Sequence, residues 1–221
     1  MLVTAGLSPH AHSERGLTIG DFIVPIGSTA RARAYLRHIA LVCLGAALVG
    51  VTANLAIAVP GTPIPVTAQT GAVLLVGGAL GLRRGLLAVL AYCVLGLFLP
   101  VYAGHAQGAA TFAALQNGSI VLGAAGGYLV GFVLAAALVG CLAARGWDRN
   151  LGGGIVAMAL GNVVIYLIGL PWLALALHLS PAEAIAQGLM PFVAGDAIKL
   201  AIASGILPFA WWLVGRRTTG R

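Results

Sequence analysis

One segment of the chain places an acidic and a basic residue inside an otherwise apolar stretch. It reads P-F-V-A-G-D-A-I-K over residues 191–199 and holds the only lysine of the protein and one of its five carboxylates. Asp196 and Lys199 are three residues apart, so on a helix they share one face. Charged side chains inside a membrane mark ligand or ion sites by default. The spacing predicts that both residues bind polar groups of a ligand. The alternative is a buried ion pair in which the two charges only neutralise each other and bind no ligand.

Further polar side chains are expected at a similar depth in the apolar segments. Gln69 opens the second segment, Tyr128 lies in the fourth, and Asn162 shares a helix face with Tyr166 in the fifth, with Trp172 further out. Each of these side chains has an alternative role as an interhelical hydrogen-bond partner or an interfacial aromatic residue. Their common depth favours one shared site.

The 100–118 loop contributes His105 and Gln107, which stand between glycines. The loop is long enough to fold over a cavity, although a single loop histidine is more often just solvated. Together with the residues above, the loop predicts a cavity that opens to the outside and is lined by amide, phenol, carboxylate and ammonium groups. Such a cavity suits a small, partly apolar molecule with amide-like and acidic groups.

Several other kinds of chemistry lack the residues they need. Lys199 follows Ile198, not the glycine of a phosphate-binding G-x-x-x-x-G-K-[ST] loop, and neither H-E-x-x-H nor G-x-S-x-G occurs. Cys43, Cys93 and Cys141 stand singly, without the spacing of a metal site, and are interpreted as small packing residues. We therefore expect no enzymatic activity, no cofactor and no bound metal.

The composition indicates an integral membrane protein. Of the 221 residues, 60% are apolar and only 8% are charged, with a mean hydropathy of +1.02, whereas soluble domains carry about 25% charged residues. We predict an all-α membrane protein with six transmembrane helices, although the short second and third segments can also be interpreted as one long or re-entrant element. The apolar segments cover roughly residues 38–59, 67–82, 86–99, 119–144, 154–177 and 191–215.

The distribution of arginines favours six spans. Six spans place eleven of the twelve cationic residues on one side, whereas the three loops on the other side contain no lysine or arginine. By the positive-inside rule, both termini are then cytoplasmic, and the net charge of +7 reflects the membrane instead of nucleic acid binding. We predict a cytoplasmic or interfacial segment over residues 1–36, a six-helix substrate-binding domain over 37–216 and a cytoplasmic tail over 217–221.

Five motifs along the chain are P-x-P-V-T-A-Q-T (63–70), L-G-L-R-R-G (80–85), G-L-F-L-P-V-Y-A-G (96–104), G-G-Y-L-V-G-F (126–132) and P-F-V-A-G-D-A-I-K (191–199). These motifs resemble those of the BioY family, the biotin-binding S components of energy-coupling factor (ECF) transporters. The resemblance covers about residues 40–212. The family's final Asp and Lys fall on Asp196 and Lys199, and its early glutamine falls on Gln69. Either His105 or Gln107 can take the place of a further polar family residue.

The resemblance implies the ECF S-component fold and biotin uptake by a multi-pass protein of the bacterial inner membrane. Biotin is then captured from outside, and a transmembrane T component with two ATPase subunits supplies the energy from ATP. We further predict that Asp196 and Lys199 hold polar groups of biotin, with Lys199 as the partner of its carboxylate. We expect Gln69, Gln107 and Tyr128 to support this pair and Trp172 to cover the apolar ring. The alternative is a self-sufficient proton-coupled transporter that uses Asp196, and the lack of a second buried carboxylate argues against it.

Overall fold

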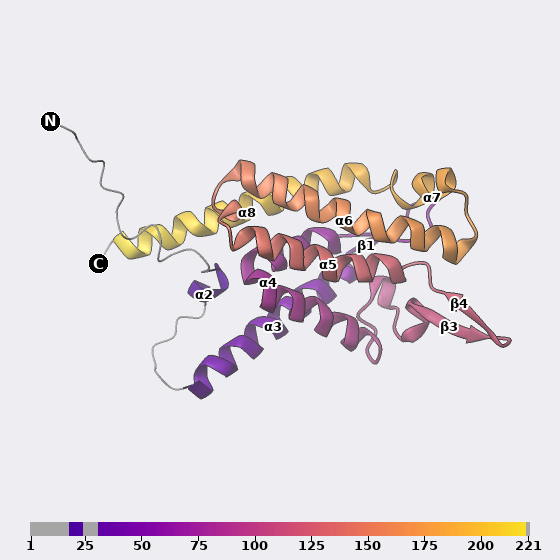
Figure 1. Cartoon of the computed structure of the whole chain (residues 1–221), viewed down its shortest axis with the longest axis horizontal. Helices are drawn as coiled ribbons and strands as arrows, with labels where there is room; N and C mark the ends of the chain where they lie inside the picture. The colour runs from indigo at the N-terminus through magenta and orange to yellow at the C-terminus, as the bar shows by residue number, and fades with distance from the viewer. Residues whose placement is uncertain (1–17, 24–30, 220–221) are drawn as a thin grey trace.

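Helices make up most of the computed structural model, which describes residues 18–23 and 31–219. Five of these helices, α3, α4, α5, α6 and α8, are long and apolar enough to cross a membrane, and the bundle they form is elongated (Figure 1). The mostly helical architecture expected from the sequence is confirmed. The helices are α2 (Gly20–Ile23), α3 (Arg31–Asn54), α4 (Gln69–Gly96), α5 (Gly126–Ala143), α6 (Leu151–Leu177), α7 (Pro181–Gly188) and α8 (Val193–Thr219).

Helix α4 reverses its direction at Gly81. This residue has φ 77° and ψ 178°, a backbone conformation open essentially to glycine alone. The side chain of Gln69 donates a hydrogen bond to the Tyr92 hydroxyl at 2.7 Å, although a straight helix separates residues 23 positions apart by about 35 Å. A Cβ atom added to Gly85 would lie 2.9 Å from the Cα of Gly77. Helix α4 is therefore a hairpin with a first arm over residues 69–80 and a second arm over 82–96.

Small residues allow α4, α5 and α6 to pack closely. A Cβ atom on Gly77 would lie 2.6 Å from the carbonyl oxygen of Ala136, and one on Gly131 would lie 2.9 Å from the Cα of Ile165. Such backbone contact suits helices in a membrane, where association depends on packing. Helix α5 is consequently enclosed by its two neighbours, and it brings Tyr128 close to α6 and α7.

Two short hairpins replace parts of the predicted spans. Strand β1 (Ala56–Ile57) pairs with β2 (Val66–Thr67), so α3 ends at Asn54 and not near residue 59. Strand β3 (Ala113–Gln116) pairs with β4 (Ser119–Leu122), so the prediction of a fourth helix from residue 119 was wrong at its start. The Asn-Gly pair at 117–118 has positive φ angles of 50° and 80°, which favour a tight hairpin.

Short one-turn 3-10 helices occur in the loops. One covers Ala103–His105 and another covers Ala109–Thr111, both ahead of β3, and a third covers Trp147–Arg149 between α5 and α6.

Helix α7 was not predicted as a separate element. It begins with Ser180 and Glu183, whose side chains cap each other's backbone N–H groups, and this S-x-x-E pattern is a recognised helix-start signal.

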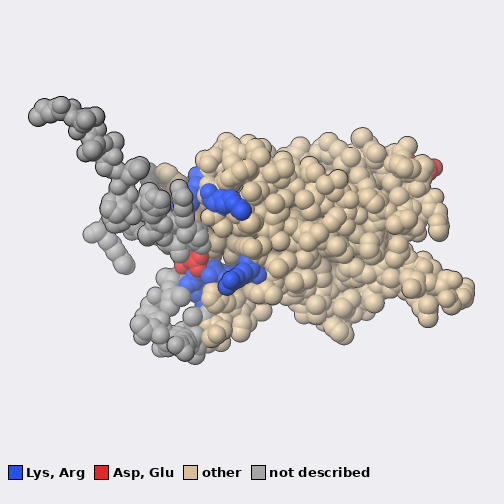
Figure 2. Space-filling view, in the orientation of Figure 1, with Lys and Arg blue, Asp and Glu red and all other residues tan. Residues whose placement is uncertain are grey.

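Basic side chains gather at the end of the molecule where α2 lies (Figure 2). We call this the arginine end. Asp21 of α2 accepts hydrogen bonds there from Arg37 at 2.5 Å and from Arg84 at 2.8 Å. Burial raises the pKa of Asp21, but hydrogen bonds from Arg84 and Thr18 outweigh it and leave the pKa below its ordinary value. The described residues of the arginine end with basic side chains include Arg37, Arg83, Arg84, Arg145 and Arg149.

Helix α2 packs across the ends of three longer helices. Ile19 is only 5% exposed and belongs to the core, and Phe22 makes an edge-to-face contact with Trp211 of α8 at 5.6 Å between ring centroids. Of the segment predicted to be cytoplasmic or interfacial, residues 1–17 and 24–30 lie outside the described residues, as do residues 220–221 of the predicted tail. The described part of the segment is docked onto the bundle.

Candidate functional site

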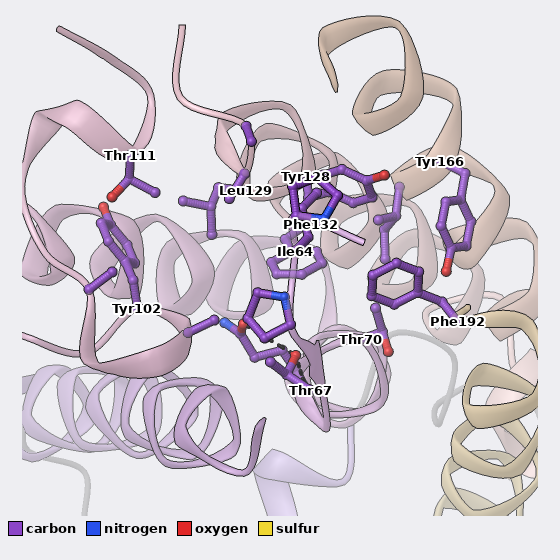
Figure 3. Close-up of a pocket in the computed structure, with 18 of the residues that line it drawn as sticks. Ile64, Thr67, Thr70, Tyr102, Thr111, Tyr128, Leu129, Phe132, Tyr166 and Phe192 are labelled. Carbon is purple, nitrogen blue, oxygen red and sulfur yellow. Dashed lines mark hydrogen bonds between the residues drawn. The ribbon is translucent and has the colours of Figure 1, made fainter. Parts of the chain in front are cut away.

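A cavity of about 120 Å³ lies in the half of the bundle that is remote from the arginine end. Tyr128, near the start of α5, lines the cavity, whereas Arg145 at the arginine end directly follows the end of the same helix. The cavity and the arginine end therefore lie at opposite ends of α5. Figure 3 shows the lining side chains, which come from the loop before α4, from α4 itself, from the 100–112 segment and from α5, α6 and α8. Its walls are mainly apolar, with a few polar groups at defined positions.

Lys199 is the one basic residue among the lining residues. Its Nζ lies 2.9 Å from Oδ1 of Asp196 and 3.2 Å from Oγ1 of Thr70. A Cβ atom added to Gly71 would lie 3.1 Å from the Cβ of Lys199, so a glycine at that position allows α8 to approach α4. An ammonium group has three N–H donors. Two of them are used within the protein, which leaves one for an acceptor in the cavity.

Asp196 lies behind Lys199 and is not a lining residue. Its side chain is 3% exposed, and it accepts hydrogen bonds from side chains of three helices. Oδ1 accepts from Thr70 at 3.0 Å and from Lys199, while Oδ2 accepts from Tyr166 at 2.5 Å and from Asn162 at 3.2 Å. The carboxylate is therefore saturated by the protein, and its direct effect is to hold the Lys199 ammonium in place.

Gln69 and Tyr128 both line the cavity. The amide nitrogen of Gln69 is fixed by the Tyr92 hydroxyl at 2.7 Å, and the amide oxygen is left with one long contact of 3.5 Å from Thr67. The Tyr128 hydroxyl donates to the carbonyl of Gly188 at 2.9 Å. Gln69 thus presents an acceptor near the cavity, whereas Tyr128 presents mainly its ring.

Besides Asp196, four other predicted residues do not line the cavity. Asn162 donates to Asp196 at 3.2 Å and is therefore linked to the cavity only through Asp196 and Lys199. Trp172 donates from Nε1 to the carbonyl of Gly123 at 2.9 Å and supports the start of α5. His105 and Gln107 are exposed in the loop, although Ala103 and Ala106 beside them do line the cavity. Contact between either loop side chain and a ligand would require the loop to move.

Sequence reasoning missed Thr70 and Tyr102. Thr70 stands directly after Gln69 and bonds to both Asp196 and Lys199, and a polar residue in the first turn of the same helix was the available signal. The Tyr102 ring lines the cavity and packs edge-to-face against Tyr92 at 5.7 Å and Phe112 at 6.2 Å. Tyr102 belongs to the motif at 96–104, but that motif alone does not distinguish a cavity residue from an interfacial tyrosine.

The fold matches that of a solved membrane protein. The structure aligns with a TM-score of 0.70 to the crystal structure at 2.1 Å of the S-component for biotin from an ECF-type ABC transporter, at 23% sequence identity and over 82% of this chain and 93% of that chain. At this level of identity the likeness defines the fold. The protein therefore has the S-component fold of ECF-type transporters.

Sequence comparison then gives the family. The BioY family matches residues 27–216, and the chain belongs to this family. It is 35% identical to the probable biotin transporter BioY of Pyrococcus horikoshii, over 76% of this chain and 91% of that protein. It is also 35% identical to the biotin transporter BioY of Thermotoga maritima, over 67% and 81%. The resemblance found in the motifs is confirmed, and the chain is a multi-pass membrane protein.

Proposed function

We propose that this protein takes up biotin by capturing it from the outer side of the membrane as the S component of an ECF-type transporter. The named activities of its relatives support the substrate. The observation that carries the proposal is the position of Lys199, which presents its ammonium group to a mainly apolar cavity while Asp196 and Thr70 hold it from behind. A charged donor in such surroundings forms a strong hydrogen bond with an acceptor oxygen.

The cavity offers a partner for each part of biotin. Biotin carries a carboxylate, a ureido group and an apolar ring system. The remaining N–H of Lys199 donates to a biotin oxygen, and the amide oxygen of Gln69 accepts from a ureido N–H. The ring of Tyr128 and the side chains of Ile64 and Phe192 pack against the apolar part. Asp196 and Asn162 act on the ligand through Lys199, while His105, Gln107 and Trp172 have supporting roles around the opening.

Binding of labelled biotin to the detergent-purified protein tests this site. Lys199→Met removes the ammonium and keeps a long side chain, so we expect biotin affinity to fall by about 10-fold to 150-fold, the value of a hydrogen bond to a charged group. Arg145→Met is the matched control, because Arg145 is exposed at the arginine end and bonds only to Cys141 among the described residues. Equal affinity in the Lys199 variant and the wild type would contradict the proposed site.

The proposed topology has six membrane spans with both termini on the cytoplasmic side. The two arms of α4 supply the second and third spans, and the turn between them carries Arg83 and Arg84 at the arginine end. Single cysteines at Gln116 and Arg145, introduced into a cysteine-free variant, report the two sides. A membrane-impermeant maleimide added to intact cells should label position 116 and not position 145. Labelling of both or the reverse pattern would overturn this topology.

Energy for transport is proposed to come from a T component and two ATPase subunits, so ATP acts only through these partners. The sequence carries no phosphate-binding loop of its own. Proteoliposomes that contain this chain alone should bind biotin without accumulating it, and co-reconstitution with the partners and ATP should restore accumulation. Uptake by the isolated chain under an imposed pH gradient would instead establish a proton-coupled transporter.

A further inference from the structure

A groove of about 940 Å³ runs along the outside of the bundle between α3 and the second arm of α4. None of its lining residues is shared with the cavity described above. One end of the groove is polar and lies at the arginine end, and the rest is apolar. The lining residues are Thr18, Asp21, His38, Ile39, Val42, Cys43, Leu80, Gly81, Leu82, Arg83, Arg84, Leu87, Leu90, Ala91, Val94 and Ala144.

The polar end of the groove has an excess of positive charge. Among the described residues that line the groove, Asp21 is the one acidic residue, and it is already paired with Arg37 and Arg84. Arg83 is exposed and has no hydrogen bond or ion pair among the described residues. Arg84 donates from Nε to Nδ1 of His38 at 2.9 Å, so a neutral His38 carries its proton on Nε2. Arg83 and His38 therefore offer donors to an anionic group.

The groove, measured from its polar end, is about as long as one membrane leaflet is thick. Its wall on α4 extends from Arg83 to Val94, which at the rise of an α-helix is about 16 Å. Half of a typical hydrocarbon core is about 15 Å. Leu87 and Val94 on this wall are 53% and 54% exposed, and Ile39 on the facing helix is 59% exposed. The groove thus joins an anion-binding end to an apolar channel that stops near the middle of the membrane.

We propose that this groove binds an anionic phospholipid of the leaflet at the arginine end. The phosphate lies against Arg83 and His38, and one acyl chain lies between Ile39 and Val42 of α3 and Leu87 and Val94 of α4. A transmembrane helix of a partner would need an apolar surface across both leaflets, which this groove does not provide. The lipid site does not depend on what the outer cavity binds.

Measurement of lipid retained by the detergent-purified full-length protein, by native mass spectrometry, tests the proposal. Phosphatidylglycerol and phosphatidylcholine are offered in mixed micelles to the wild type, to Arg83→Gln and to the control Arg145→Gln. We expect the wild type to retain phosphatidylglycerol in preference, and we expect Arg83→Gln to weaken this retention about fivefold, the effect of one basic residue near an anionic lipid. Arg145→Gln should retain the wild-type preference.

A second variant tests the apolar channel without a change of charge. Ala91→Trp fills the groove, and it should reduce the retention of phosphatidylglycerol as well. Biotin binding is measured in every variant and should stay at the wild-type level, which separates this site from the outer cavity and reports folding. Equal loss in Arg83→Gln and Arg145→Gln, full retention in Ala91→Trp, or displacement of the lipid by inorganic phosphate alone would each overturn the proposal.

Discussion

Removal of the Asp196 carboxylate should destabilise the protein even when no ligand is present. Asp196→Asn keeps the size of the side chain but removes the charge that holds Lys199. It also places an amide NH2 group next to donors from Thr70, Tyr166 and Asn162, where the wild type has only acceptors. The variant therefore leaves a partly buried ammonium without its ion pair and brings donors into contact with donors.

The size of the effect follows from burial. Loss of one partner of a buried ion pair destabilises a protein by about 3–5 kcal/mol. The Asp196 side chain is 3% exposed but that of Lys199 is 18% exposed, so water relieves part of the cost and we expect about 3 kcal/mol. At about 2–4 °C per kcal/mol for a chain of this size, the midpoint of thermal unfolding should fall by about 6–12 °C.

Thermal unfolding of the detergent-purified protein without biotin is the assay. The double variant Asp196→Asn with Lys199→Met removes both charges, so its loss of stability should be clearly smaller than the sum of the two single losses. A wild-type melting temperature for Asp196→Asn would refute the reasoning. So would additivity of the two changes to within about 0.5 kcal/mol, because residues that do not interact behave in that way.

Three further predictions concern other parts of the molecule. Asp21→Asn should lower stability at neutral pH by about 2 kcal/mol. Because the pKa of Asp21 is lowered in the folded state, the stability difference from wild type should be full above about pH 5 and should shrink as the pH falls through that lowered pKa. Melting curves recorded between about pH 7 and 3 check this sign. Gly81→Ala should cost about 1–3 kcal/mol because of its φ of 77°, whereas Gly205→Ala, with open space around the added Cβ, should be close to neutral in the same thermal assay. Tyr92→Phe removes the acceptor for the buried Gln69 amide, so biotin affinity should fall severalfold and stability should fall by about 1–3 kcal/mol; unaltered affinity would show that Gln69 needs no such support.

Biotin titrations provide a shared control for these variants. A variant that retains its melting temperature and loses affinity affects the cavity, whereas one that loses both affects the fold. Gly81→Ala belongs to the second kind, because it acts on the turn at the arginine end. The double variant of Asp196→Asn with Lys199→Met and the single variant Tyr92→Phe change both the cavity and buried hydrogen bonds, so for these variants affinity is compared at temperatures well below the melting midpoint.

The chain sequence determined the membrane class, the approximate positions of the apolar helices and the pair at the centre of the site. Hydropathy and charge are properties of each residue, so their pattern along the chain predicts which segments enter the membrane. The contact between Asp196 and Lys199 was also predictable, because residues three apart on one helix are neighbours whatever surrounds them. Motifs around Gln69 and Lys199 were sufficient to indicate the family.

Only the tertiary structure decided which of these residues face the cavity and which hold the others in position. Thr70 is 126 residues from Asp196, and Tyr166 is 30 residues away, so no local pattern shows that they saturate its carboxylate and leave Lys199 to face the cavity. The break between the second and third apolar segments was expected from the charge pattern, whereas the close contact between the two arms of α4, such as that of Gly85 with Gly77, is decided by the packing. Side chains that bond across helices are brought together by packing, and packing is a property of the whole bundle, which no single segment of the sequence contains.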